Sequence, residues 1–205
     1  MSVPVDTPVY GDDFRTPIAR IPAKNFLDEP TVVVPVRTRG AWTQVLTPSR
    51  RILPSQATAE HPAPAQTAAW LPTASLLPFG AIPNRIVVSV SRQTLVITTA
   101  AGVPTRTFPV GVGTTQTPTP TGVTGYLQAR YLDPAQDQTK HRIQLTSLHA
   151  TGADEPYGGA DGGLIGLHFQ QSATGAVSHG CLRLSGDAVD AIDALPLGTP
   201  IVIDK

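Results

Sequence analysis

The sequence has a single cysteine and no surplus of charge of either sign. With 15 Lys and Arg against 15 Asp and Glu, it has no basic field that would collect nucleic acid or anionic lipid. No apolar run approaches the roughly 20 residues of a membrane-spanning helix. The opening residues, MSVPVDTPVY, have neither the basic nor the apolar part of a signal peptide. One cysteine cannot form an intrachain disulfide and does not indicate the redox compartment. We therefore expect a soluble chain without a nucleic-acid partner.

Proline and glycine are distributed unevenly and divide the chain. The first 84 residues hold 13 of the 21 prolines but 3 of the 18 glycines, which indicates a boundary near Pro83. Residues 1–30 have scattered prolines and no sustained hydrophobic period, so we expect an extended arm with little regular structure. Residues 31–83 contain short β-prone pieces, TVVVPVR, AWTQVL and AAWLPTASLL. With Trp42 and Trp70 as core or groove residues, these pieces resemble a small SH3-like β-barrel.

Residues 84–205 have the pattern of a β-rich domain. In 85–98, apolar residues alternate on both sides of the polar break SRQT, which predicts a hairpin. Further strands are expected within 105–113, 125–132, 142–150, 163–169 and 200–203. One short helix is expected near the C-terminus, beginning after the N-cap Ser185 and ending at Pro196. The predicted fold class is therefore mainly β.

The stretch 178-SHGCLRL-184 surrounds Cys181 with groups that could activate a thiol. A thiolate attacks a carbonyl far better than a thiol does, so a catalytic cysteine needs a base or a cation nearby. If the stretch is one extended strand, His179, Cys181 and Arg183 share a face, and the two leucines point into the core. Nine residues separate His168 from this stretch, a spacing at which neighbouring strands can bring it to the cysteine.

Gly180 gives the backbone unusual freedom directly before the cysteine. It permits conformations closed to other residues and leaves room for a substrate. The backbone N–H groups of residues 180 and 181 could then stabilise an oxyanion, a contribution of about 10²–10³ in rate for one donor. The stretch therefore contains the parts needed for acyl transfer.

Other interpretations of these residues are open at this point. A lone cysteine is commonly a small buried hydrophobe. His168, His179 and Cys181 are acceptable zinc ligands, but they lack the paired spacing of structural zinc sites and need a further ligand. His149 precedes a glycine-rich loop and is expected to fill a core or cleft rather than to catalyse. We predict no metal and no cofactor.

The motif 165-IGLH-168 followed by 178-SHGCLRL-184 resembles the signature of the L,D-transpeptidase catalytic domain, the YkuD-type family. The pieces 86-IVVSVSRQTLVI-97, 108-FPVGVG-113 and 118-PTPTG-122 are similar to that family's opening hairpin, its Phe-Pro-Val and glycine turn, and its Thr-Pro-Thr-Gly loop. The resemblance covers residues 84–205. It implies a β-sandwich enzyme of bacterial cell walls, here preceded by the SH3-like barrel.

The resemblance also implies a reaction on peptidoglycan. Cys181 would attack the carbonyl that follows the diamino acid of a tetrapeptide stem and expel the terminal D-alanine. A second stem's amine, or water, would then resolve the thioester. His168 matches the general base, oriented by the backbone carbonyl of Phe169. The remaining motif positions, which shape the site, bind substrate and supply the oxyanion pocket, are Ser178, His179, Gly180 and Arg183. Carbapenem-type β-lactams are the expected inhibitors.

Two features depart from the family pattern. The nine-residue spacer between His168 and Ser178 is short and suggests a trimmed loop over the cleft. Phe169 stands where a small residue is usual and suggests a narrower or more apolar entrance. The glycine-rich loop 151–163 is a candidate lid with Tyr157 as a candidate substrate contact, and an ordinary surface loop is the alternative.

Two other functions fit parts of the sequence. A sortase-like cysteine transpeptidase also has His, Cys and Arg in this chain order, but the close His-Gly-Cys step argues against it. A non-catalytic peptidoglycan-binding protein is the other, and the intact Cys181 and His168 argue against it. The cell-wall role implies export to the wall or periplasm, so we expect a leader or anchor to precede Ser2 in the parent reading frame.

Overall fold

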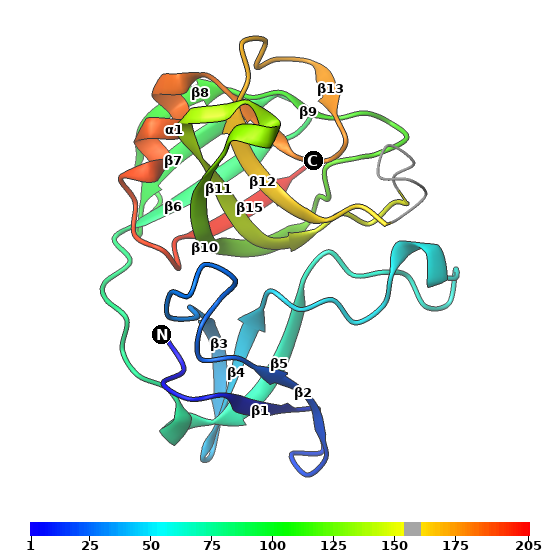
Figure 1. Cartoon of the computed structure of the whole chain (residues 1–205), viewed down its shortest axis with the longest axis vertical. Coiled ribbons are helices and arrows are strands. Elements are labelled where there is room, and N and C mark those ends of the chain that lie inside the picture. Colours follow the sequence, from blue (N-terminus) through cyan, green and yellow to red (C-terminus); the bar gives the residue numbers. More distant parts are fainter. Residues whose placement is uncertain (154–160) are drawn as a thin grey trace.

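The structure, a computed structural model, describes residues 1–153 and 161–205. These residues form two units, one above the other in Figure 1. Five strands near the N-terminus make one sheet, and the later strands make an eight-stranded sheet with a two-stranded sheet beside it. One α-helix lies in the described part of the chain, so the fold is mainly β, as predicted.

The N-terminal unit is an antiparallel five-stranded sheet in the order β2-β1-β5-β4-β3. Its strands are β1 (Thr7–Tyr10), β2 (Pro17–Ile21), β3 (Val34–Arg39), β4 (Trp42–Thr47) and β5 (Thr67–Pro72). Two short 3-10 helices, η1 (Pro54–Gln56) and η2 (Thr73–Ser75), lie outside the sheet. Apolar side chains close a small core on this sheet, with Val33, Val45 and Leu71 fully buried. The sheet is open in the part of the chain that the structure describes, and the SH3-like barrel stays a prediction.

Strands β1 and β2 both lie within residues 1–30, so the expected extended arm is wrong. Thr7 and Val9 are buried and Pro8 between them is exposed, which is the two-residue alternation of a strand. The alternating stretch is too short to be recognised among the prolines of this segment. β1 pairs with β2 as a local hairpin, and Tyr10 also pairs with Trp70 of β5, which joins this hairpin to strands much later in the chain. A local pairing and a tertiary contact therefore act together in a segment whose sequence pattern favours no element.

The second unit is built on an eight-stranded sheet in the order β14-β12-β11-β10-β15-β6-β7-β8 (Figure 1). The strands are β6 (Asn84–Ser89), β7 (Thr94–Thr99), β8 (Pro104–Pro109), β10 (Val123–Asp133), β11 (Gln138–His149), β12 (Leu164–Phe169), β14 (Leu182–Leu184) and β15 (Pro200–Asp204). β9 (Val112–Gly113) and β13 (Ala176–Ser178) pair separately, and η3 (Pro134–Gln136) joins β10 to β11. The predicted hairpin around SRQT is confirmed as β6 and β7.

Helix α1 (Gly186–Asp193) begins where the sequence predicted. The hydroxyl of Ser185 accepts a hydrogen bond from the amide of Ala188 at 3.4 Å, and Asp187 lies in the first turn near the positive end of the helix dipole. The apolar side of α1, with Val189 and Ile192 fully buried, packs onto the core of the large sheet. Burying a side chain of this size contributes about 1.5–3 kcal/mol, so this contact holds α1 against β11 and β12.

The two units contact each other through buried hydrogen bonds. The hydroxyl of Tyr126 on β10 donates to the carbonyl of Val32 at 2.9 Å, and the hydroxyl of Ser147 on β11 donates to Gln66 Oε1 at 2.6 Å. Burial raises the pKa of Tyr126 far above its ordinary value, so this phenol stays a neutral donor. Among the described residues, no helix is long and apolar enough to cross a membrane.

Candidate active site

Cys181 lies at the end of a bend between two short strands. β13 ends at Ser178 and β14 begins at Leu182, and Gly180 between them has φ +111°, a conformation that L side chains rarely adopt. The expectation that 178–184 forms one strand is therefore wrong. Strand alternation cannot place His179 in a row with Cys181 across this bend, and the His179 side chain is exposed to solvent.

Parallel pairing of β12 with β14 places the strand that carries the predicted base alongside the segment that carries the predicted nucleophile. His168 lies opposite Arg183 in the register, and Leu167 lies opposite Leu182. Both leucines are fully buried, so His168 and Arg183 share the other face of the sheet. The Sγ atom of Cys181 accepts a hydrogen bond from the amide of Gly166 on β12 at 3.4 Å. The sulfur therefore lies beside Gly166, two residues before His168 on the same strand.

The ring of His168 is held in one tautomer. Its Nδ1 lies 3.2 Å from the carbonyl oxygen of Phe169, and because a carbonyl can only accept, Nδ1 carries the proton and Nε2 keeps its lone pair. Burial lowers the pKa of His168 below its ordinary value, and the charge of Arg183 lowers it further, while the Phe169 carbonyl opposes them. The imidazole is therefore neutral at neutral pH and can accept a proton at Nε2.

The site uses the backbone of Phe169, while its side chain packs elsewhere. Its ring packs against the core and lies 5.2 Å from the ring of His141. The ring therefore does not supply the narrower, apolar entrance expected from the sequence. The Phe169 carbonyl also accepts a second hydrogen bond, from the side-chain amide of Gln138 at 3.1 Å.

Ser178 holds the bend before the cysteine. Its hydroxyl donates to the carbonyl of Cys181 at 2.6 Å and accepts from the amide of Gly180 at 3.2 Å, and the residue is 2% exposed. The Gly180 amide, expected as an oxyanion donor, is engaged inside the bend in this structure. Ser178 and Gly180 therefore form the frame that presents Cys181.

A loop from elsewhere in the chain supports this bend from behind. Thr119 donates to the carbonyl of Gly180 at 2.8 Å and accepts from the amide of Gly113 at 2.8 Å, while Thr117 donates to the carbonyl of Ser178 at 3.2 Å. A Cβ on Gly113 would lie 2.3 Å from the Thr117 carbonyl oxygen, so only glycine allows this close approach. The sequence identified the Thr-Pro-Thr-Gly piece by its resemblance to a loop of the family, but it did not indicate the contacts of this loop with the bend.

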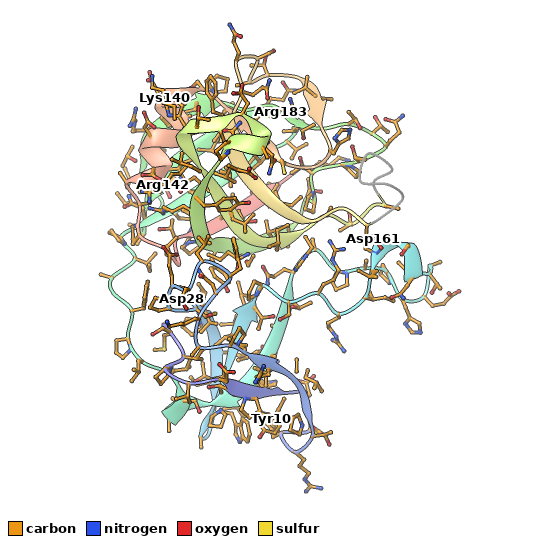
Figure 2. All side chains as sticks on the ribbon, viewed as in Figure 1. Tyr10, Asp28, Lys140, Arg142, Asp161 and Arg183 are labelled. Carbon is orange, nitrogen blue, oxygen red and sulfur yellow. The ribbon has the colours of Figure 1, made fainter. Side chains whose placement is uncertain are left out.

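Arg183 contributes a cation to the face of the sheet that carries His168, and Figure 2 shows it in the upper unit. Its backbone pairs with Gly111 through two hydrogen bonds of 2.9 Å. Its Nε is buried and has no hydrogen-bond partner among the described residues. A buried donor of this kind is costly unless a further group meets it, which makes Arg183 a candidate for contact with a substrate oxygen.

Residues 83–203 match the family model described as L,D-transpeptidase catalytic domain. The chain belongs to this family. The YkuD protein of Bacillus subtilis (strain 168) is 29% identical over 125 residues, which cover 60% of this chain and 68% of that protein.

Solved L,D-transpeptidase structures are similar at low identity. The Mycobacterium smegmatis enzyme is 18% identical with a TM-score of 0.45, over 85% of this chain and 100% of that chain. The Xylanimonas cellulosilytica enzyme is 18% identical with a TM-score of 0.42, over 63% of this chain and 65% of that chain, which is less than two thirds of its length.

Two residues singled out from the sequence, His149 and Tyr157, remain to be placed in the structure of this L,D-transpeptidase. His149 is buried where the two units meet, which confirms the prediction that it fills a core or cleft. Tyr157 lies outside the described residues. Sequence patterns did not indicate the hydrogen bond of Gln138 to the Phe169 carbonyl or that of Arg50 to the Gly162 carbonyl, because each partner is distant in the chain. Across residues 1–153 and 161–205, no group of three or more His, Cys, Asp or Glu side chains is arranged to hold a metal ion.

Proposed function

We propose that this protein is a peptidoglycan L,D-transpeptidase that works through a thioester on Cys181. The observation that carries the proposal is the Cys181 sulfur over Gly166 on β12, the strand that also carries a neutral His168 with its Nε2 lone pair available. A thiol beside a neutral imidazole is the arrangement that nucleophilic acyl transfer needs. Membership of the L,D-transpeptidase family supports the substrate class and, with it, a location in the cell envelope.

The first half-reaction forms the acyl-enzyme. Nε2 of His168 accepts the thiol proton as Sγ bonds to the carbonyl carbon that follows the diamino acid of a tetrapeptide stem. The bond from that carbon to the nitrogen of the terminal D-alanine breaks, and the imidazolium returns its proton to the departing amine. In the second half-reaction an amine of another stem, or water, loses a proton to His168 and attacks the thioester, which releases the thiol.

The neighbouring residues have distinct roles in this proposal. Arg183, with its buried and unpartnered Nε, binds an oxygen of the stem, and its charge adds to the burial that lowers the pKa of His168. Ser178 and Gly180 hold the bend that presents the cysteine, and the Phe169 carbonyl orients the base. His179 is exposed beside the bend and is available to a bound stem.

The test compares the wild-type chain with Cys181→Ala. Because the chain has one cysteine, labelling with iodoacetamide reports on that thiol alone. Incubation with a defined tetrapeptide stem should give a mass increase on the wild type and free D-alanine, and a carbapenem should form a stable adduct. Cys181→Ala should lose all three signals, while Ser172→Ala, an exposed change in the loop before the bend, should keep them.

Other outcomes would contradict the proposal. Release of D-alanine by Cys181→Ala would show that the nucleophile is misassigned. Turnover of a sorting-signal peptide in place of the wall stem would favour the sortase-like alternative. Binding to purified cell wall without thiol labelling or D-alanine release would favour a non-catalytic peptidoglycan-binding protein.

A further inference from the structure

A histidine at the end of β11 is bound on three sides by the N-terminal unit. His149 is 7% exposed, and its backbone amide donates to the carbonyl of Ala65 at 2.8 Å. Its Nε2 lies 2.9 Å from the carbonyl of Pro48, so Nε2 carries the proton. Its Nδ1 accepts a hydrogen bond from Nε of Arg50 at 3.3 Å. These partners all come from residues 48–66, the segment between β4 and β5, which we call the β4–β5 segment.

The guanidinium of Arg50 also joins the two ends of the loop between β11 and β12. Its Nη2 donates to the carbonyl of Ala150, which follows β11, and to the carbonyls of Gly162 and Gly163, which precede β12; the Ala150 and Gly163 bonds are both 3.4 Å. One planar cation with several donors suits a cluster of carbonyl oxygens of this kind. Arg50 therefore ties the chain leaving one strand to the chain entering the next.

Two further contacts join residues 150–153 to residues 161–163. We call these two segments together the neck. The amide of Ala150 donates to the carbonyl of Gly163 at 3.0 Å, and Ala153 forms a β-bridge with Asp161. The hydroxyl of Ser55 donates to the carboxylate of Asp161 at 2.7 Å, which adds a second tie from the β4–β5 segment. Figure 2 shows Asp161 on the side of the upper unit that meets this segment.

The neck adjoins two segments of the candidate active site: strand β12, and the loop that supports the bend before Cys181. Gly163 leads directly into β12, whose Gly166 contacts the Cys181 sulfur and whose His168 is the candidate base. On the other side, a Cβ built on Gly152 would lie 3.5 Å from the Gln116 carbonyl oxygen. Gln116 belongs to the loop whose threonines hold the bend before the cysteine.

We propose that Arg50 is a positioning residue for the transpeptidase reaction, and that through it the N-terminal unit holds the neck against the substrate site. This inference rests on the function proposed above and goes beyond it, because it makes the β4–β5 segment part of the acyl-donor site. A small electrophile needs only the thiol, whereas a stem peptide has to be held beside it. Loss of Arg50 should therefore spare thiol reactivity and impair the reaction with a stem.

The experiment uses the full chain with Arg50→Ala, Arg50→Lys and the control Arg51→Ala. The side chain of Arg51 is exposed and makes no hydrogen bond or ion pair in the described part of the chain. Arg50→Ala should lower kcat/KM for D-alanine release by about 10- to 100-fold, mainly through KM, because small misplacements near a reacting group have effects of this size. Iodoacetamide should label Cys181 at the wild-type rate. Arg50→Lys should recover part of the loss, and Arg51→Ala should behave as the wild type.

A second readout needs no substrate. The amide of Ala150 bonds across the neck, so its hydrogen exchange should become faster in Arg50→Ala and stay unchanged in Arg51→Ala. Unchanged exchange, or kcat/KM within twofold of the wild type, would overturn the inference.

If Arg50→Ala fails to fold, Ser55→Ala and Asp161→Asn provide the test. Each removes the exposed hydrogen bond between Ser55 and the Asp161 carboxylate of the neck, and each should show the same two changes to a smaller degree. If neither of these two variants changes kcat/KM or the hydrogen exchange of Ala150, the inference is overturned as well. A wild type that releases no D-alanine would refute the proposed function, and the exchange of Ala150 would still decide whether Arg50 holds the neck.

Discussion

His168 and Gln138 donate to one carbonyl oxygen. Nδ1 of His168 lies 3.2 Å and the amide nitrogen of Gln138 lies 3.1 Å from the oxygen of Phe169. Gln138 is 6% exposed and is held beside η3 through the Gln136 carbonyl at 3.2 Å. The tip of the β10–β11 hairpin therefore shares the group that orients the candidate base.

Removal of the Gln138 amide, the second donor to the Phe169 carbonyl, should raise the pKa of His168. The hydrogen bond to Phe169 raises the pKa of His168, and an acceptor freed from Gln138 binds the imidazole N–H more strongly. In Gln138→Met, which keeps the length of the side chain, the acid limb of the pH–rate profile for D-alanine release should move to higher pH. The plateau rate should stay within about fivefold of the wild type, because the substitution leaves the thiol and the imidazole in place. An unmoved acid limb would contradict this view of Gln138.

The rate of acyl-enzyme formation should fall on the acid side of neutrality. The pKa of His168 lies below the ordinary 6.5, chiefly because the ring is buried and then because Arg183 is nearby. A base is active when neutral, so the rate should hold at neutral pH and fall as the pH drops through this lowered pKa. The profile of kcat/KM against pH measures the midpoint.

Arg183→Leu tests the cause of that shift. Without the neighbouring cation the pKa of His168 should rise, and the acid limb should move to higher pH even if substrate binding also weakens. A wild-type midpoint above 6.5, or a variant midpoint that moves to lower pH, would show that His168 is not the titrating base.

Ser178→Ala should destabilise the bend before the cysteine. The substitution leaves the Gly180 amide and the Cys181 carbonyl without their hydroxyl partner in a buried place, a loss of about 1–3 kcal/mol in the free energy of unfolding. Acylation should slow as well, because the bend sets the direction of the thiol. Denaturant unfolding and iodoacetamide labelling measure the two effects. Ser172→Ala, on an exposed loop, is the matched control and should change neither.

Gly113→Ala should displace the loop that supports the bend. The added methyl would lie 2.3 Å from the Thr117 carbonyl oxygen and 2.5 Å from the Thr119 nitrogen, so the backbone has to move. We expect a loss of about 1–3 kcal/mol in stability, as for other overpacked sites, together with slower acylation. Gly11→Ala in the N-terminal unit is the control, because a Cβ there would lie no closer than 3.9 Å to another atom. Equal behaviour of the two variants would show that the close approach at Gly113 is not required.

Several elements could be predicted from local sequence because each is determined by residues close together in the chain. The alternation in 85–98 indicated a hairpin, and β6 and β7 pair around the polar break as expected. Ser185 and the apolar positions after it indicated the start of α1. Periodicity did not reveal β1 and β2, which pair with each other, and the strand that joins them to the rest of the sheet, β5, lies more than forty residues later.

The sequence by itself determined which groups this protein has for chemistry: one cysteine, a histidine separated from the cysteine motif by nine residues, and a glycine that permits the bend. Tertiary structure decided how they are used. The parallel register of β12 and β14 places His168 beside Arg183 and the Cys181 sulfur over Gly166. The positive φ of Gly180 breaks the strand that alternation predicted, since a backbone angle at one residue redirects every side chain after it. The support from Thr119 and from Arg50 of the other unit could not be inferred from local patterns, because such contacts depend on where distant segments meet.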